Sequence, residues 1–350
     1  MRVRVPTVCF GFQSSVRLVL SAAFLCFVVL ASAPAGADVR PPVGVGVAPG
    51  ATMPGGALGD ESDADLWRRA RQGESFSLGG AVSGSPILIQ SQGENWRAIR
   101  NGPLSTYGGW LLLVAVAAVA GFFLLRGRVR LEHRSGRLIH RFTGNERLAH
   151  WFVAGNFILL GLSGLILLFG KYVLSPVIGA KAFAVVASAS LQGHNLFGPL
   201  FAFGVVWMFA LYLKENLPRR EDIIWALKGG MFFKAHVPSW KFNMGEKGWF
   251  WISSLTGFAL AASGLLMEFP WIAESRQQLQ LANLIHGASA VLVIGASLGH
   301  MYLGTIGVEG AFEGMVTGRV DEEWAKEHHS LWADEMLAKA EKAEKKEAAE

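Results

Sequence analysis

The sequence predicts an all-α integral membrane protein with five transmembrane helices. Of its 350 residues, 51% are hydrophobic and only 17% are charged, against about 25% charged residues in soluble domains. Five apolar segments approach the length that a helix needs to cross a bilayer, and the loops between them alternate between basic-rich and basic-poor. The net charge of +5 is modest and its Lys and Arg lie in loops rather than along one stripe, so nucleic acid is excluded as a partner.

Residues 1–37 have the pattern of a secretory signal peptide. Basic residues precede the apolar run LVLSAAFLCFVVL, and AGA at 35–37 is a small-residue cleavage site. The chain's two cysteines, Cys9 and Cys26, both lie in this segment. A mature chain starting near Asp38 would therefore hold no disulfide, no thiolate-ligated iron–sulfur cluster and no thioether-attached haem. An uncleaved signal anchor is the alternative.

The next part of the chain is expected to be a periplasmic N-terminal extension over 38–107. It begins rich in Pro and Gly, RPPVGVGVAPGATMPGGALG, and then becomes mixed. It contains no catalytic motif. A transmembrane helix follows over 108–126, and a cytoplasmic basic loop over 127–148.

The apolar segments and the charges between them predict the orientation. The segments are 109–125, 149–170, 195–213, 249–267 and 281–304. The loops at 126–148 and 214–248 each carry seven basic residues, whereas 171–190 carries two and 268–280 carries one. The positive-inside rule places the two basic loops in the cytoplasm. A secreted N-terminus followed by five spans also ends there, so we expect a multi-pass protein of the bacterial inner membrane, in contact with membrane lipid, with a cytoplasmic C-terminus. The charged tail, 321–350, is expected to be a solvated helix.

Four of the nine histidines lie in or beside apolar spans: His150, His194, His286 and His300. His286 and His300 are fourteen residues apart, which is within about 40° of four helical turns and corresponds to roughly 21 Å along the axis. The topology places His194 and His286 near the periplasmic face, and His150 and His300 near the cytoplasmic face. The four side chains are therefore expected to form two cross-helix pairs.

Paired imidazoles at two depths are what bis-histidine ligation of two b haems requires. Ionisable side chains inside a membrane are functional by default, and a low-spin iron takes one nitrogen on each side of the porphyrin. A membrane metal transporter is the alternative use of such histidines. It predicts His and carboxylates clustered at one depth, whereas the acid near a span, Glu268, sits at the span's end. A structural membrane anchor is a further alternative.

Five stretches carry a resemblance to a known family: NERLAHWF (145–152), LQGHNLFGPL (191–200), WKFNMGEKGWFW (240–251), LIHGASAVLVIGASLGHMYLGT (284–305) and GMVTGRVDEEWAKEHH (314–329). In order and spacing they resemble the gamma subunit of membrane-bound formate dehydrogenase, a dihaem cytochrome b related to the cytochrome b subunits of nickel–iron hydrogenases. The resemblance implies a four-helix transmembrane haem-binding bundle over 149–320 with one additional N-terminal transmembrane helix.

The resemblance also implies roles for particular residues. His194 and His286 would bind the periplasmic-side haem, and His150 and His300 the cytoplasmic-side haem. An iron–sulfur beta subunit would dock from the periplasm and pass electrons from the catalytic alpha subunit through both haems to a quinone. Asn243 and Gly245 would line the quinone site. Because substrate chemistry lies in another subunit, a hydrogenase cytochrome b subunit stays an alternative.

Independently of the resemblance, KFNMGEKG (241–248) is a polar loop at a membrane edge. Its amide can bond a quinone carbonyl, and Glu246 or Lys247 could relay protons. The alternative is a turn with lysine snorkelling to the interface. Arg141 and Arg147 are candidate partners for haem propionates, although basic residues of a cytoplasmic loop need no such role.

Overall fold

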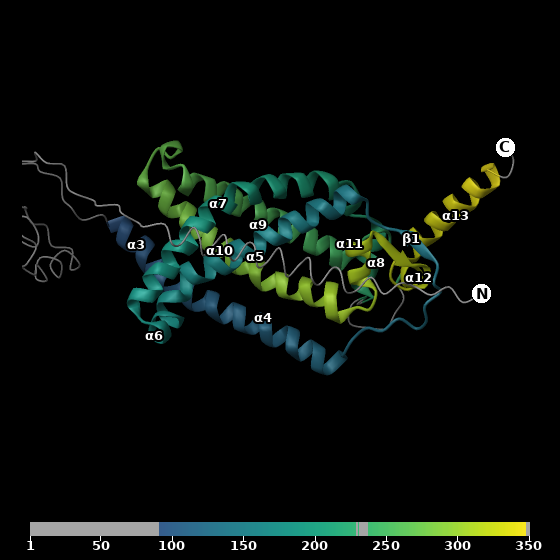
Figure 1. Cartoon of the computed structure of the whole chain (residues 1–350), viewed down its shortest axis with the longest axis horizontal. Helices are drawn as coiled ribbons and strands as arrows, with labels where there is room; N and C mark the ends of the chain where they lie inside the picture. Colours follow the sequence, from purple (N-terminus) through teal and green to yellow (C-terminus); the bar gives the residue numbers. More distant parts are fainter. Residues whose placement is uncertain (1–90, 229, 231–236, 348–350) are drawn as a thin grey trace, which may run out of the picture. The chain divides into compact units, whose positions relative to one another are not determined.

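The computed structural model describes residues 91–228, 230 and 237–347 (Figure 1). The signal peptide expected at 1–37 and most of the extension expected at 38–107 lie outside the described residues. The chain divides into two compact units, and one of them covers Ser32–Ala98. Its described part is most of α3 (Ser91–Ile99). The paragraphs below concern the other unit, from Ile99 onward.

Five helices are long and apolar enough to cross a membrane, as expected. They are α4 (Ser105–Arg126), which follows η1 (Arg100–Leu104), α5 (Gly144–Val173), α7 (Ala180–Tyr212), α9 (Met244–Glu268) and α10 (Arg276–Tyr302), which η4 (Leu303–Gly307) continues. Each is longer than its apolar segment, and α5 and α9 start earlier at a polar capping residue. Thr143 begins α5 and Asn243 begins α9, each accepting a hydrogen bond from the N–H of a glutamate three residues later.

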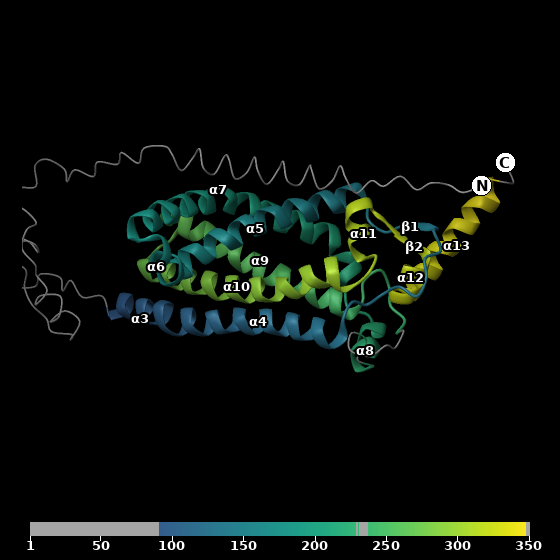
Figure 2. The same cartoon turned by 60° about the horizontal axis from the view of Figure 1, so that its bottom comes forward.

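Helices α5, α7, α9 and α10 form a four-helix bundle, and α4 lies along α10 (Figures 1 and 2). In the bundle, α5 packs mainly on α7, α10 on α9, and α7 on α9. The buried core between them consists of Val153, Phe201, Val205, Leu260 and Val293. Short elements connect the long helices: α6 (Ser175–Ile178), η2 (Lys214–Asn216), α8 (Arg220–Leu227) and η3 (Pro270–Ile272).

Glycines allow α4 to approach α10 closely. A Cβ on Gly295 would come within 2.8 Å of Leu111 of α4, and one on Gly287 within 2.9 Å of Leu104, the last residue of η1. In the reverse direction, a Cβ on Gly108 would lie 3.1 Å from Val291. Small residues that admit a neighbour's side chain are typical of specific packing between membrane helices. The additional helix is therefore fitted to α10 rather than loosely tethered beside it.

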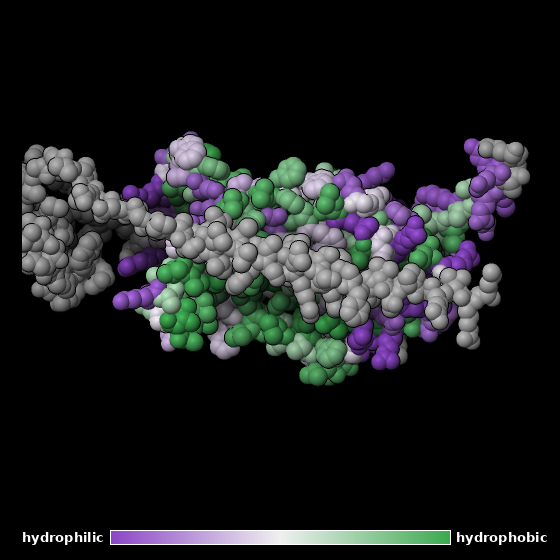
Figure 3. All heavy atoms as spheres, in the orientation of Figure 1, coloured by the Kyte–Doolittle hydropathy of each residue, from purple (hydrophilic) through white to green (hydrophobic). Residues whose placement is uncertain are grey.

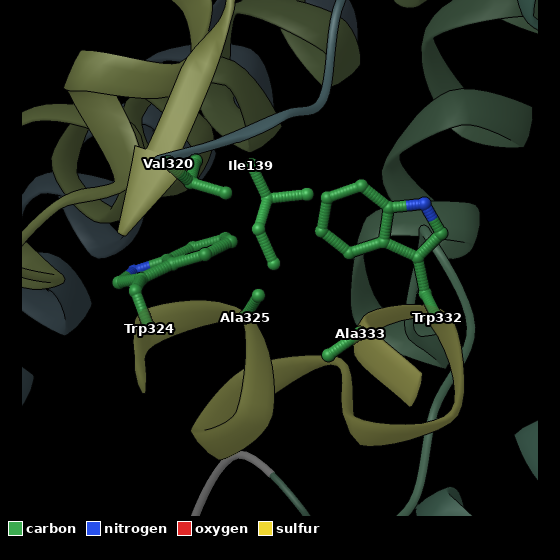
Figure 4. Packing of buried hydrophobic residues seen from close by; sticks show 6 residues of the cluster. All are labelled: Ile139, Val320, Trp324, Ala325, Trp332 and Ala333. Atoms are coloured by element: carbon green, nitrogen blue, oxygen red, sulfur yellow. The ribbon is translucent and has the colours of Figure 1, made fainter. Parts of the chain in front are cut away.

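A small polar and aromatic layer closes one end of the bundle, here called the sheet end. Strand β1 (Leu138–His140) pairs antiparallel with β2 (Arg319–Asp321), with Ile139 opposite Val320. Helices α11 (Ala311–Thr317), α12 (Glu322–His328) and α13 (Ser330–Glu347) complete the layer. Figure 4 shows Ile139 between the rings of Trp324 and Trp332.

The first part of the tail differs from the solvated helix expected at 321–350. Trp324 and Trp332 are only 2% and 6% exposed, and Ala325 and Ala333 are fully buried. These side chains cover Ile139 of β1, so burial of apolar surface fixes this segment. Beyond Ala333, α13 is mostly exposed, as expected.

The apolar surface of the long helices is that of a multi-pass membrane protein. Figure 3 shows apolar side chains over the middle of the long helices and polar ones toward both ends. On α4, Leu113 is 62% exposed, Leu124 80% and Leu125 92%. Exposed leucines in such number on one helix are stable against lipid and costly against water.

Candidate functional site

The four membrane histidines meet as the two pairs that the sequence predicts. The ring centres of His150 and His300 are 6.1 Å apart, and those of His194 and His286 are 5.9 Å apart. His150 lies on α5 and His194 on α7, and both partners lie on α10. We call His150 with His300 the first pair and His194 with His286 the second pair. Ligation of haem by these pairs stays a prediction.

The two pairs lie at different levels of the bundle. On α10 the fourteen-residue separation corresponds to roughly 21 Å. On the other side, His194 contacts Ser163 of α5, thirteen residues after His150, which is roughly 20 Å of helix. The first pair is nearer the sheet end, where α5 begins.

The ring separations fit a metal held between two imidazoles. Two metal–nitrogen bonds of roughly 2 Å, plus about 1 Å from each nitrogen to its ring centre, put the centres about 6 Å apart. All four rings are half-buried, so each retains open surface against which a flat group can lie. The donor sets also suit iron in a porphyrin, because each consists of two neutral nitrogen ligands from opposite sides.

Serine and glycine side by side hold each ring of the second pair. The hydroxyl of Ser163 lies 2.8 Å from Nδ1 of His194, and that of Ser263 lies 3.1 Å from Nδ1 of His286. Each serine is followed by a glycine whose Cβ, if present, would lie within 3.4 Å of Cε1 of the same ring. Hydrogen bonding through Nδ1 leaves Nε2 as the nitrogen available to a metal.

The first pair is held differently. Nδ1 of His150 is buried and has no hydrogen-bond partner, and Trp151 meets this ring edge-on at 5.1 Å. Trp249 stacks on His300, with ring centres 4.6 Å apart and an angle of 12°. Aromatic packing therefore orients these imidazoles, where hydroxyl groups orient those of the second pair.

Two ion pairs cross between the starts of α5 and α9. Arg141, just before α5, lies 3.0 Å from Glu246 of α9. Lys241, just before α9, lies 2.8 Å from Glu146 of α5. These reciprocal contacts bring the starts of α5 and α9 together at the sheet end. The predicted propionate partners both have partners within the chain, because the guanidinium of Arg147 donates to the carbonyls of Met315 and Val316.

The KFNMGEKG motif lies beside the first pair and starts α9. The side-chain oxygen of Asn243 accepts the N–H of Glu246 at 3.0 Å, which leaves the NH2 group of Asn243 as the donor suited to a quinone carbonyl. A Cβ on Gly245 would lie 3.3 Å from the ring of Trp225. Trp249, one turn further along, stacks on His300, so the residues predicted for quinone are close to one of the predicted ligands.

Lys247 has a structural partner that the sequence does not reveal. Its ammonium lies 2.7 Å from Asp222 of α8 and donates to the carbonyl of Leu217 at 3.0 Å. The lysine and aspartate side chains are only 3% and 5% exposed. This buried ion pair joins α8 to α9 and accounts for the lysine without proton relay.

His329 is a buried residue that sequence reasoning placed in a solvated tail. Its Nδ1 donates to the carbonyl of Trp240 at 2.7 Å, and Nε2 lies 3.1 Å from the guanidinium of Arg141. Burial lowers the pKa of His329 to about 3 although Glu246 opposes the shift; the nearby guanidinium lowers it further. The ring is therefore neutral at physiological pH and accepts a hydrogen bond from the arginine. In the sequence, only the tryptophans at 324 and 332 indicate that this part of the tail is buried.

Comparison with known proteins identifies what the chain resembles. Residues 141–318 match the family described as prokaryotic cytochrome b561. The nitrate-inducible formate dehydrogenase cytochrome b556(Fdn) subunit of Escherichia coli K12 is 31% identical over 223 residues, which cover 61% of this chain and 97% of that protein. The formate dehydrogenase cytochrome b556 subunit of Haemophilus influenzae is 29% identical over 222 residues, or 61% and 90% of the two chains. The cytochrome b556(fdo) subunit of E. coli K12 is 31% identical over 209 residues, or 58% and 96%.

Proposed function

The chain belongs to the prokaryotic cytochrome b561 family, and we propose that it is the membrane cytochrome b subunit of a formate dehydrogenase complex. Membership confirms the resemblance found in the sequence and implies haem b as cofactor. The complex follows from the names of the relatives, which are formate dehydrogenase cytochrome subunits. The observation that carries the proposal is the pairing of four half-buried imidazoles at two levels of one bundle.

In this proposal the chain holds two haems. His194 and His286 bind one, His150 and His300 bind the other, and α10 supplies one ligand to each. When bound, a b haem supplies a one-electron carrier whose potential its axial ligands and their hydrogen bonds set. The chain's own residues orient the rings and separate the two sites along α10.

The orientation of the chain decides where its partners dock. We propose that the sheet end faces the cytoplasm of a bacterium and that the second pair lies towards the periplasm, because the basic loops flank the sheet end. The other end exposes Trp271, Ile272 and Val177, at 77%, 61% and 80%. An apolar rim of this kind fits an iron–sulfur beta subunit that delivers electrons from a catalytic alpha subunit.

A quinone is the proposed electron acceptor, bound beside the first pair by Asn243 and Gly245. Asn243→Ser is the sharpest test, because serine keeps a cap for α9 and removes the NH2 donor. We expect both haems to be retained and quinone reduction to weaken. Unchanged quinone kinetics would exclude Asn243 from the site.

The haem count tests the proposal as a whole. Purified wild-type protein is expected to give two haems per chain in a pyridine haemochrome assay. His194→Ala and His286→Ala should each remove one haem, and the double variant should remove no more than that. His150→Ala should remove the other haem. His140→Ala, at an exposed histidine in β1, is the matched control and should retain both.

Two outcomes would contradict parts of this proposal. One haem per wild-type chain, or a colourless protein made with ample haem supply, would overturn the two-site arrangement. Copurification with a nickel–iron catalytic subunit, in place of a formate-oxidising one, would assign the chain to a hydrogenase and leave the haem sites intact.

A further inference from the structure

Helices α5 and α9 repeat one pattern at an interval of 100 residues. Both follow a capping residue, at 143 and 243, and both carry the capping glutamate at 146 and 246. Further along, LSGLILLFG at 162–170 corresponds to ASGLLMEFP at 262–270. The crossed ion pairs described above link equivalent positions, 141 with 246 and 241 with 146. The bundle therefore consists of two similar hairpins, α5 with α7 and α9 with α10.

The shared Ser-Gly step is where each hairpin meets a histidine. Ser163 of α5 contacts His194 of α7, and Ser263 of α9 contacts His286 of α10. The first pair does not follow this symmetry, because the position on α9 equivalent to His150 is Phe250. The Ser-Gly contact is thus a repeated feature of the second pair alone.

Hydrogen bonding fixes the direction of each Ser–His contact. The one hydroxyl proton of Ser163 is directed to backbone carbonyls of its own helix, at 2.8 Å from Leu159 and 3.1 Å from Leu160. Its oxygen is then an acceptor for Nδ1–H of His194, whose ring also bonds the backbone carbonyl of Leu160. Ser263 is arranged in the same way, 2.5 Å from the carbonyl of Ala259. Both imidazoles are therefore held as the Nδ1–H tautomer, with the lone pair of Nε2 directed away from the serine.

Glycine allows this contact to be short. A Cβ on Gly164 would lie 3.4 Å from Cε1 of His194, and one on Gly264 would lie 3.2 Å from Cε1 of His286. Contacts this close are tolerated only where the neighbour can yield. Adjacent residues of one helix thus contact two neighbouring atoms on one edge of each ring, the serine oxygen at Nδ1 and the glycine at Cε1.

We propose that Ser163 and Ser263 are positioning residues that fix the tautomer and electron donation of His194 and His286 toward the metal of the second site. The inference rests on the proposed haem ligation and goes beyond it, because it assigns different tuning to the two sites. Accepting the second N–H of a metal-bound imidazole makes that ligand more basic. A more basic ligand favours the oxidised metal and lowers the reduction potential. His150, whose Nδ1 has no partner, lacks this contribution.

The experiment is a redox titration of the purified haem-loaded complex, followed in the α-band. The variants are Ser163→Ala and Ser263→Ala, with Ser297→Ala as control. Ser297 is a buried serine of α10 whose hydroxyl donates to the carbonyl of Ile294. The component that disappears in His194→Ala identifies the second site in the titration. Ser163→Thr, which keeps the hydroxyl, tests rescue.

Each Ser→Ala variant is expected to raise the potential of the second site and to leave that of the first unchanged. A tenfold change in the relative affinity for the two oxidation states, at the low end for such partners, corresponds to about 59 mV. Ser297→Ala should move neither potential, and Ser163→Thr should restore the wild-type value.

Two results would overturn the inference. An unmoved second-site potential in both variants, with both haems present, would show that the serines do not tune the site while leaving the haem ligation standing. An equal shift of both potentials would show a general packing effect. If His194→Ala removes no component, the haem ligation itself fails and the titration reports that separately.

Discussion

The buried ion pair between Lys247 and Asp222 gives the most quantitative prediction. The ammonium and carboxylate are 2.7 Å apart, and both side chains are almost inaccessible. At present the carboxylate of Asp222 accepts the N–H of Arg219 at 2.6 Å and so caps α8. Asp222→Asn would keep the size of the side chain and an oxygen for this cap. It would remove the negative charge beside the buried ammonium of Lys247 and leave it only neutral acceptors, an amide oxygen and the carbonyl of Leu217.

The expected cost follows from burial. Removing one partner of a buried pair destabilises a protein by about 3–5 kcal/mol, because an uncompensated charge stays inside. Lys247→Met should cost less than Asp222→Asn, since the remaining carboxylate keeps the N–H of Arg219. The double variant removes both charges and should recover most of the loss, because replacing a buried pair by less polar groups is often close to neutral.

The measurement is a double-mutant cycle on unfolding in mild detergent by titration with dodecyl sulfate, followed by helical circular dichroism. A coupling energy of about 2–4 kcal/mol is expected from the buried geometry. Two single variants that each cost below about 1 kcal/mol and simply add would refute the reasoning, because such values belong to exposed pairs. Quinone reduction by the folded double variant gives an independent check. Retained activity supports a purely structural role for Lys247, and lost activity would favour a role in proton relay.

Three further predictions concern other parts of the fold. His329 has a pKa of about 3 in the folded chain against an ordinary 6.5, so between these values the unfolded state binds one more proton and stability should fall on acidification. His329→Gln should therefore reduce the fall in the thermal midpoint between pH 7.5 and 5. An identical fall in both proteins would contradict this. Burial raises the pKa of the Asp321 carboxyl, but hydrogen bonds from the N–H groups of Gly136, Ser135 and Glu323 outweigh it and hold the pKa below the ordinary value. Asp321→Asn should cost about 1–3 kcal/mol and speed amide exchange in β1 and β2, so unchanged exchange rates would count against it. A Cβ on Gly108 would lie 3.8 Å from the Cβ of Val291, which is about the mean Cβ separation in disulfides. In a chain with Cys9 and Cys26 replaced by Ser, Gly108→Cys with Val291→Cys should cross-link under mild oxidation. The control pair, Gly109→Cys with Val291→Cys, should not.

Much of the fold follows from local sequence signals. The five spans are confirmed because apolar runs of bilayer length have few alternatives to helix. The meeting of His194 with His286 could be predicted because alternating loop charges fix the direction of each span, and helix rise then fixes the depth of each ring.

The remainder depends on contacts between distant segments. The burial of Trp324 and His329 could not be predicted, because a densely charged tail gives no sign that β1 will pair with β2 and cover it. Lys247 was open to two interpretations because its partner lies 25 residues earlier, on a short helix without a strong sequence signal. The role of Ser263 was missed for a different reason: serine next to glycine in a membrane helix is usually explained by packing alone.

The crossed ion pairs at the sheet end have a consequence for biogenesis. When the first hairpin has entered the bilayer, Arg141 and Glu146 still await Glu246 and Lys241, which leave the ribosome about 100 residues later. In the folded chain each of these charges pairs with one from the other half, so each half carries a surface that matches the other. Two separately synthesised halves, divided between α8 and α9, should thus associate in the same membrane. Swapping the charges of one pair should be tolerated, whereas reversing a single charge should not.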